Sequence, residues 1–340
     1  MTATAVKAGR LKFLVVGCGS IGQRHIRNLN AIGAGEVIAC EPVPAKAEKV
    51  RCELNAPVYA SMGDALAQRP DAVLICTPSA YHLSQARAAL DVGCDIFVEK
   101  PIAHILDGLD EFCHQAETAG AITMVGYNWR FHPQFLRMKE MLQEGAIGKI
   151  HSARVNCGQY LPDWHPWEDY RQMYSARRAL GGGILLDSHE LDYITWFLGD
   201  VDRVTGVASK ISDLEIETED TADIILTFRS GAQASVHLDY LQRPAQRSYE
   251  FYGAEGTLRW SRDGDLSVYR ASAGEWQQFS LPNEFDINST YIDELQHFID
   301  CVRSRKSACV DARRAKYVLE LIVPLSVGPC GRVASTSGLR

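Results

Sequence analysis

The stretch L11-K-F-L-V-V-G-C-G-S-I-G22 decides the fold of this chain. Its first six residues are mostly apolar, as in a buried strand, and glycines 17, 19 and 22 follow at once. The next segment, IGQRHIRNLNAIG (21–33), has the apolar spacing of an amphipathic helix and ends in glycine. A strand that runs through G-x-G-x-x-G into a helix is typical of a dinucleotide site, because the glycines let backbone N–H groups approach a pyrophosphate.

The same alternation of strand and helix continues outward from this stretch. Further apolar runs lie at 36–40, 72–77, 95–99 and 122–127. A second amphipathic segment, SAYHLSQARAALDVG (79–93), lies between two of them and also ends in glycine. Continuous apolar strands that alternate with helices predict a parallel sheet covered on both faces. We therefore expect an α/β fold whose residues 1–127 form a doubly wound Rossmann domain.

The hydrophobic pattern of the sequence changes after about residue 150. Shorter strands with alternating polarity, broken by glycine turns, lie at 222–241 and 257–270 and predict a mostly antiparallel sheet. We expect residues 128–340 to form a second α/β domain with a large open sheet. Helical stretches at 289–304 and 311–323 could pack back on the first domain. Large apolar residues among polar ones on the open face indicate an oligomer interface, so we expect a homodimer or homotetramer.

Composition excludes several classes of protein. The chain has 340 residues, 46% of them hydrophobic and 23% charged, and this length favours two domains. The formal net charge is −7 with no cationic run, so we expect neither a nucleic-acid partner nor an anionic-membrane partner. No apolar stretch approaches the ~20 residues that cross a bilayer, and the N-terminus lacks the apolar core of a signal peptide. Ten cysteines without a C-x-x-C pair indicate reduced thiols in a cytoplasmic protein with no metal site.

Glu41 ends the second strand at the position where an acid binds the ribose 2′-OH of a dinucleotide. Its carboxylate would repel a 2′-phosphate, which favours NAD over NADP, although the nearby Lys46 leaves NADP open. The alternative is a glycine turn with an acid there by chance. The expected cofactor-binding residues are Gly17, Gly19, Ser20, Ile21, Gly22, Glu41, Thr77, Pro78, His82, Glu99, Lys100 and Asn128.

Lys100 follows directly after the apolar run at 95–99, and Pro101 comes next. Thr77-Pro78 similarly follows the run at 72–77, and ligands of open parallel sheets bind at these C-terminal strand ends. Near a cationic nicotinamide, a desolvated lysine would lose its preference for the ammonium form. It could then exchange the proton of a substrate hydroxyl. The alternative is a solvated lysine at a strand end.

A second candidate lies in G181-G-G-I-L-L-D-S-H-E-L-D192, where a glycine turn opens into an amphipathic helix. His189 and Asp192 are three residues apart and would share a helix face. A carboxylate beside an imidazole fixes its tautomer and raises its basicity, as a proton relay requires. The alternative is a helix cap, in which Asp187 and Ser188 hold the first turn.

These motifs together resemble the Gfo/Idh/MocA family of oxidoreductases, the group of glucose–fructose oxidoreductase and inositol dehydrogenase. The motifs are G17-C-G-S-I-G22, Glu99-Lys100-Pro101, G126-Y-N-W-R130 and G181-G-G…H189-x-x-D192, and the resemblance runs from about Leu11 to about Leu325. It implies a Rossmann domain followed by an α/β domain whose sheet often mediates dimers or tetramers. It also implies NAD(P)-dependent oxidation or reduction of a sugar, cyclitol or related compound, with Lys100 catalytic and His189 as its partner in proton transfer.

The chain departs from the family at one point. Many members place an aspartate four residues before this histidine, whereas Asp187 is two residues before it. Two residues apart on a helix, the side chains would lie on nearly opposite faces. Either the turn before His189 is non-helical or Asp187 is not the acid of a Lys–Asp–His set. The expected catalytic residues are Lys100, His189, Asp192 and Asp187, with the aspartate partner of His189 left open.

The aromatic segment W164-H-P-W-E-D-Y-R-Q-M-Y174 suits a sugar, because aromatic faces stack on sugar rings and polar groups bind hydroxyls. Tyr170 and Arg171 are the first candidates, and Trp164 and Tyr160 follow. The alternative is that the tryptophans pack between the domains. The expected substrate-binding residues are Lys100, Asn128, Arg130, Tyr160, Trp164, Tyr170, Arg171 and His189.

The sequence therefore predicts an oxidoreductase that moves hydride between a nicotinamide cofactor and a hydroxyl-bearing carbon of a sugar or cyclitol. Two alternatives use the same motifs: an NAD-dependent glycosidase of the same family, and an NAD-binding regulator without turnover.

Overall fold

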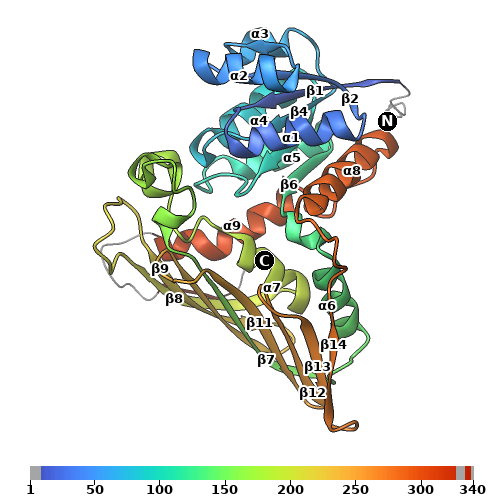
Figure 1. Cartoon of the computed structure of the whole chain (residues 1–340), viewed down its shortest axis with the longest axis vertical. Coiled ribbons are helices and arrows are strands. Elements are labelled where there is room, and N and C mark those ends of the chain that lie inside the picture. The colour runs from blue at the N-terminus through green and yellow to red at the C-terminus, as the bar shows by residue number, and fades with distance from the viewer. Residues whose placement is uncertain (1–8, 327–333, 338–340) are drawn as a thin grey trace. The chain divides into compact units, whose positions relative to one another are not determined.

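The computed structural model describes residues 9–326 and 334–337. The chain divides into two compact units (Figure 1). The first comprises Met1–Asn128 and Ile287–Leu319, and the second comprises Trp129–Asp286 and Glu320–Arg340. The helical segment at 287–319 is thus part of the first unit. The sequence placed it in the span of the second domain and left open that it packs on the first.

The first unit is the doubly wound parallel domain that the sequence predicts. Within the described residues its sheet has six parallel strands in the order β3-β2-β1-β4-β5-β6. The strands are β1 (Leu11–Val16), β2 (Gly35–Cys40), β3 (Val58–Tyr59), β4 (Ala72–Ile75), β5 (Asp95–Glu99) and β6 (Thr123–Gly126). The helices are α1 (Ser20–Ala31), α2 (Pro44–Leu54), α3 (Met62–Leu66), α4 (His82–Asp91), α5 (Leu109–Ala119), α8 (Asn288–Ser304) and the start of α9 (Ala312–Ser326). Of these strands only β3 was not predicted from the sequence, because its two residues give no apolar run.

Helix α8 returns to the first unit through specific contacts with its sheet. Phe298 packs edge-on against Phe97 of β5, with ring centroids 5.7 Å apart, and both rings are fully buried. Arg305, just after α8, pairs with Asp95 at the start of β5 at 2.6 Å. A helix from late in the chain therefore packs on a sheet whose strands all lie before residue 127.

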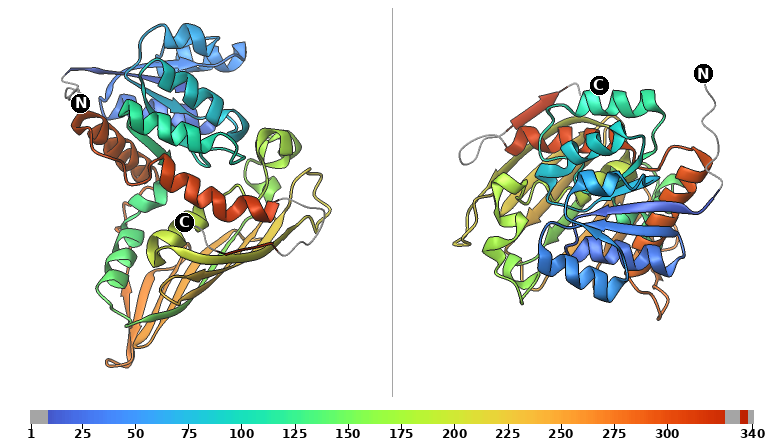
Figure 2. Two further views of the ribbon diagram at one scale, coloured as in Figure 1. Left: turned by 180° about the vertical axis from the view of Figure 1, so that it is seen from behind. Right: turned by 90° about the horizontal axis from the view of Figure 1, so that it is seen from above.

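The second unit contains the large, mostly antiparallel sheet (Figures 1 and 2). In the described part of the chain it has nine strands in the order β14-β13-β12-β11-β7-β10-β9-β8-β15, and only the β7–β10 pair is parallel. The strands are β7 (Ile150–Gly158), β8 (Val201–Ser209), β9 (Thr221–Phe228), β10 (Gln233–Asp239), β11 (Gln246–Gly253), β12 (Gly256–Ser261), β13 (Leu266–Arg270), β14 (Glu275–Phe279) and β15 (Ala334–Ser337). β15 was not predicted from the sequence.

Helices α6 (Pro133–Gln143) and α7 (His189–Leu198) pack on this sheet through an aromatic core. Phe135 of α6 contacts Tyr249 of β11 and Trp260 of β12, with ring centroids 5.2 and 5.0 Å away. Phe135 also meets Tyr193 of α7 edge-on at 5.4 Å. This core fixes the start of α7 against the segment that follows β6 in the chain.

Three general findings bear on the class of protein. No helix within 9–326 and 334–337 is both long and apolar enough to span a membrane. In the same residues, no group of three or more His, Cys, Asp or Glu side chains could hold a metal ion. No disulfide joins the nine cysteines among them.

Candidate cofactor and catalytic sites

The glycine loop after β1 is shaped by its neighbours in the first unit. Gly17 has φ +88°, and a Cβ there would lie 2.8 Å from Thr77 Cγ2. A Cβ on Gly22 would lie 1.9 Å from the Gly17 carbonyl oxygen, so neither position accepts a side chain. Gly19 differs, because a Cβ there would meet nothing within 4 Å. The loop thus packs tightly on one side and leaves open space beside its middle glycine.

Helix α1 begins directly at this open space. Gly19 is its N-cap, makes no side-chain capping bond, and no acidic residue follows in the first turn. The first backbone N–H groups of a helix lack intrahelical partners and carry its positive dipole end. The open side of Gly19, together with Ser20 and Ile21 at the helix start, fits the pyrophosphate of a dinucleotide.

Glu41 immediately follows β2 and is buried. One carboxylate oxygen accepts the Cys18 N–H at 2.9 Å, and the other accepts the Val43 N–H at 3.0 Å. The acid expected to bind a ribose therefore also holds the glycine loop in shape.

His82 links the two strand ends that were predicted to line the cofactor site. Its ring is buried, with Nδ1 2.7 Å from the Pro101 carbonyl oxygen and Nε2 2.7 Å from that of Thr77. The Thr77 hydroxyl donates to Gln85 at 2.6 Å. His82 was expected to bind the cofactor directly, whereas its two nitrogens contact the backbone of the loops after β4 and β5.

Lys100 is half-buried directly after β5, and the preceding residue, Glu99, contacts a cluster of buried side chains that the sequence did not predict. Glu99 Oε1 lies 2.7 Å from Nε2 of His25, which is fully buried in α1. Glu294 of α8 is also buried, and this burial, followed by the charge of Glu99, raises the pKa of Glu294 well above its usual value. His25 comes three residues after Gly22, and only the fold brings it to Glu99. The cluster fixes the backbone from which Lys100 emerges.

Asn128 is buried at the end of the first segment of this unit. Its side-chain amide donates to the Thr290 hydroxyl at 2.9 Å, and that hydroxyl donates to the Ile287 carbonyl at 2.7 Å. Asn128, a candidate for both cofactor and substrate, thus binds the first turn of α8.

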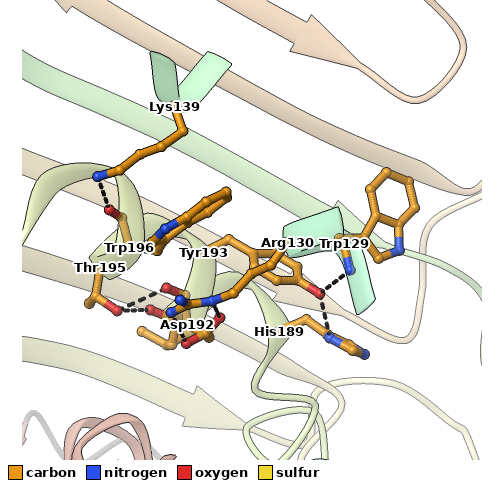
Figure 3. Close-up of polar contacts among 9 residues, drawn as sticks. Trp129, Arg130, Lys139, His189, Asp192, Tyr193, Thr195 and Trp196 are labelled. Atoms are coloured by element: carbon orange, nitrogen blue, oxygen red, sulfur yellow. Dashed lines mark hydrogen bonds and ion pairs between the residues drawn. The ribbon is translucent and has the colours of Figure 1, made fainter. Parts of the chain in front are cut away.

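In the second unit, α7 begins at His189 (Figure 3). Asp187 and Ser188 precede the helix, and the Ser188 side chain makes no capping bond. The turn before His189 is therefore non-helical, which was the first of the two possibilities that the sequence left open. His189 Nδ1 lies 3.0 Å from the hydroxyl oxygen of Tyr193, and the Trp129 N–H donates to the same oxygen at 3.2 Å.

Asp192 binds a partner that spacing within the helix could not reveal. Its two carboxylate oxygens accept from Nε and Nη2 of Arg130, each at 2.7 Å (Figure 3). The exposed fractions of the two side chains are 0% for Asp192 and 7% for Arg130. Arg130 also lies over the ring of Trp196, 5.1 Å from its centroid. Arg130 was expected to bind substrate and Asp192 to support His189, whereas the structure joins them in a buried ion pair.

The neighbouring acid, Glu190, forms a second such pair. It contacts Nε of Arg247 on β11 at 2.7 Å, and both side chains are largely buried. The Arg247 guanidinium lies 4.7 Å from the ring centroid of Trp129. Two largely buried ion pairs thus anchor the first turn of α7.

Residues 161–180, which include the aromatic segment, contain four short 3₁₀ turns. They are η3 (Leu161–Asp163), η4 (Tyr170–Gln172), η5 (Tyr174–Ala176) and η6 (Arg178–Leu180). Arg171 is exposed and pairs with Asp169 at 2.8 Å and with Glu215 at 2.5 Å. The Tyr170 hydroxyl accepts the Glu215 N–H at 3.2 Å.

The two other substrate candidates, Tyr160 and Trp164, also have protein partners. Arg243 lies 3.6 Å over the ring of Tyr160 and forms two bonds, of 2.8 and 3.0 Å, with Asp163. Trp164 donates to the Gln159 carbonyl at 3.3 Å and meets Tyr240 edge-on at 5.2 Å. Tyr160 precedes the aromatic segment, whereas the other three candidates lie within it. Arg171 and the neighbouring Arg243 both pair with carboxylates.

Comparisons with known proteins agree with this arrangement. Residues 11–127 match the NAD-binding Rossmann fold of an oxidoreductase family, and residues 135–259 match the GFO/IDH/MocA C-terminal domain. The chain is 28% identical to D-apiose dehydrogenase of Paraburkholderia graminis over 323 residues, which cover 89% of this chain and 84% of that one. It is 27% identical to myo-inositol 2-dehydrogenase of Thermotoga maritima over 324 residues, covering 90% and 92%. A crystal structure of a probable dehydrogenase from Thermotoga maritima, 25% identical, superimposes with a TM-score of 0.76 and covers 92% of this chain and 95% of that one.

Proposed function

Because this chain belongs to the Gfo/Idh/MocA family of oxidoreductases, we propose that it is an NAD-dependent dehydrogenase of a sugar, a cyclitol or a related compound. One observation carries the proposal. Gly17 follows β1 and Lys100 follows β5, and these parallel strands, separated by β4 alone, end at the same edge of one sheet. Ligands of open parallel sheets bind at this edge. A lysine at a fixed position there suits a group that acts beside a bound nicotinamide.

NAD is the proposed cofactor, with NADP disfavoured. Glu41 is buried beside the glycine loop, where it accepts the Cys18 and Val43 N–H groups. A carboxylate at this position would repel a 2′-phosphate. A ribose 2′-OH can instead donate to a remaining lone pair of the same carboxylate.

The chain's own residues would handle the proton of the substrate hydroxyl. When bound, the nicotinamide supplies the hydride acceptor for the carbinol carbon. Lys100 takes the hydroxyl proton, and His189 passes it on. The support for these roles is local to each residue: Lys100 follows a strand end fixed by the Glu99–His25 contact, and His189 heads α7 with Nδ1 held by Tyr193. Asp187 lies outside the helix, and Asp192 supports the site through Arg130.

A neutral polyol suits the second unit better than an acidic sugar. Arg171 pairs with two carboxylates and Arg243 with one, so the charge of each is already balanced. Tyr170 and Trp164 remain as aromatic surfaces that can stack on a sugar ring. Neutral hydroxyls can be recognised by such groups without displacing an ion pair.

The open face of the second sheet is the proposed interface of a homodimer or homotetramer. On β9, Ile224 is buried while the adjacent Ile225 is 48% exposed. Exposed apolar side chains on a sheet face favour association. Light scattering after gel filtration would give the mass in solution, and a monomer would contradict this proposal.

The experiment that tests the function is a panel of substrates in which NADH absorbance reports the reaction with each compound. Neutral inositols, pentoses and hexoses are compared with the corresponding uronates, each with NAD and with NADP. We expect NADH to form with a neutral polyol, and faster than NADPH. Release of an aglycone from aryl glycosides without net NADH would instead indicate a glycosidase. Tight NADH binding with no turnover of any compound would indicate a regulator.

A further inference from the structure

We propose that Asp239 is a positioning residue for the segment 159–164, which carries Tyr160 and Trp164, and that it acts through the turn at 239–242. This inference rests on the proposed function, in which Trp164 is an aromatic surface for the sugar ring. It names the group that decides where the aromatic side chains of this segment lie. Sequence motifs did not single out Asp239, which ends β10.

The carboxylate of Asp239 organises the turn that follows β10. Its Oδ1 accepts the N–H groups of Leu241 and Gln242, each at 2.7 Å. An aspartate that bonds its own backbone two residues on is a common turn former. The side chain is only 7% exposed, and hydrogen bonds to an ionised acceptor are stronger than those to a neutral one. The conformation of the turn is thus tied to this one side chain.

The other carboxylate oxygen of Asp239 is held by His237. The Nε2 atom of His237 lies 3.1 Å from that oxygen, and its Nδ1 lies 2.7 Å from Asp223 on β9. Hydrogen bonds with Asp239 and with Asp223 raise the pKa of His237 to about 9, so the ring is a cation at neutral pH and donates from both nitrogens. A Cβ on Gly158 would lie 2.3 Å from Oδ2 of Asp239, so the carboxylate also packs on the end of β7. Both oxygens therefore have a fixed place.

The segment is bound to this turn by its backbone. Three N–H groups of the segment donate to carbonyls of the turn: Gln159 to Asp239 at 3.1 Å, Tyr160 to Gln242 at 2.8 Å, and Leu161 to Tyr240 at 3.0 Å. Arg243, directly after the turn, lies 3.6 Å from the ring centroid of Tyr160 and forms two hydrogen bonds with Asp163. A change in the turn must therefore reach the segment.

Trp164 packs on residues that the turn holds. Its ring meets that of Tyr240 edge-on, with centroids 5.2 Å apart, and Tyr240 is fully buried within the turn. The indole N–H donates at 3.3 Å to the carbonyl of Gln159, whose own N–H donates to the Asp239 carbonyl. The position of the indole therefore follows that of the turn.

The test is amide hydrogen exchange of the ¹⁵N-labelled protein, read residue by residue by NMR in wild type and in Asp239→Ala. The variant leaves the N–H groups of Leu241 and Gln242 without their acceptor. We expect exchange at these two amides to become at least about tenfold faster, the effect of losing a hydrogen bond to a charged group. The amides of residues 159–161 should become faster by a similar factor, although their own acceptors are backbone carbonyls that the variant keeps. Unchanged exchange at 159–161 would overturn the proposal.

The matched control is Asp223→Ala. It removes the other carboxylate that contacts His237, but this side chain is 64% exposed and lies on β9, outside the turn. Exchange at 159–161 and 241–242 should stay within about threefold of wild type, as for loss of a surface ion pair. An increase equal to that of Asp239→Ala would overturn the proposal, because a general effect of charge would explain both. Asp239→Asn, whose amide oxygen can still accept the N–H groups of the turn, should return exchange to within about threefold of wild type.

A measurement on the wild type keeps the proposal testable if Asp239→Ala does not fold. The segment cannot stay in place while the turn opens. After correction for intrinsic exchange rates, the amides of residues 159–161 should therefore be no better protected than those of Leu241 and Gln242. Protection of 159–161 at least about tenfold greater than that of the turn would overturn the proposal.

Kinetics separates positioning from a general loss of structure. With a substrate that the panel identifies, Asp239→Ala should raise KM at least about fivefold while kcat and the Kd for NADH stay within about threefold, because the loss falls on substrate binding. An unchanged KM would overturn the positioning role. The exchange measurement needs neither substrate nor cofactor. A protein that oxidises no polyol would therefore defeat the proposed function, whereas exchange at 159–161 would still decide whether Asp239 holds the segment.

Discussion

Replacing Asp192 by asparagine separates a structural role of this residue from a catalytic one. Asparagine has nearly the same shape as aspartate but no charge, so it leaves the Arg130 guanidinium buried without a counter-charge. Both carboxylate oxygens lie 2.7 Å from Arg130, and neither side chain is more than 7% exposed. Breaking such a pair from one side costs about 3–5 kcal/mol, because a charge remains out of water.

We expect Asp192→Asn to lower the free energy of unfolding by about 3 kcal/mol, the lower limit of this range, because the amide oxygen still accepts one hydrogen bond from Arg130. For a unit of this size, that loss corresponds to roughly 6–12 °C in Tm. The double variant Arg130→Met, Asp192→Leu should recover most of the loss, because apolar residues of similar volume often replace a buried ion pair at little cost.

Tryptophan fluorescence during urea unfolding is the appropriate assay. All six tryptophans of the chain lie between residues 129 and 276, so the signal reports the second unit. The matched control is Glu140→Gln on α6. The Glu140–Arg137 pair spans 3.2 Å and both side chains are more than 40% exposed, so its loss should cost at most about 0.5 kcal/mol.

Activity decides the interpretation. Below its lowered Tm, the Asp192→Asn variant should keep kcat within a few-fold of wild type, because the wild-type carboxylate binds Arg130 and takes no part in proton transfer. An unchanged free energy of unfolding together with a kcat reduced by ~100-fold or more would refute this reasoning and return Asp192 to the proton relay.

Three further outcomes are expected. Gly19→Ala should leave Tm unchanged, because the added Cβ enters open space, and should weaken NADH binding at least about tenfold, because that space is the proposed pyrophosphate site. Gly22→Ala should lower Tm, because its Cβ would lie 1.9 Å from a backbone oxygen. Thermal melts measure Tm, and fluorescence titration measures NADH affinity. Glu41→Gln should raise the ratio of NADP to NAD activity at least about tenfold by removing the charge beside the ribose position. Hydrogen bonds with Asp239 and with Asp223 raise the pKa of His237 to about 9. The stabilisation that protonated His237 gives the folded state is therefore complete below about pH 6.5 and lost as pH rises through 9. The Tm difference between wild type and His237→Gln should narrow over that range.

The sequence predicted those parts of the fold that depend on local patterns. The strand, glycine turn and helix at 11–31 are specified by adjacent residues, and the structure confirms all three. The antiparallel strands β9 and β10 were equally visible, because alternating polarity and the turn at Gly231 lie within one short stretch. β15 was missed because Ala334–Ser337 carries no apolar alternation of its own.

The contacts of the candidate site were harder to predict because they join distant residues. His25 and Glu99 are 74 residues apart, and Arg130 and Asp192 are 62 apart. A helix spacing rule identified Asp192 as a neighbour of His189 but could not show which charge the carboxylate would meet. Tyr193 lies four residues after His189, on the same face of the helix, but the sequence could not show that its hydroxyl contacts both His189 and the Trp129 N–H. The sequence indicates which residues can carry chemistry, whereas tertiary packing decides their partners.

The central claim is that Lys100 exchanges the proton of a polyol hydroxyl beside bound NAD. The most direct test is turnover by Lys100→Met with the polyol that the substrate panel identifies, measured together with NADH affinity by fluorescence titration. We expect kcat to fall at least about 100-fold, as for loss of a general acid–base group, with the Kd for NADH within about threefold of wild type. A Lys100→Met variant with wild-type kcat would contradict the claim.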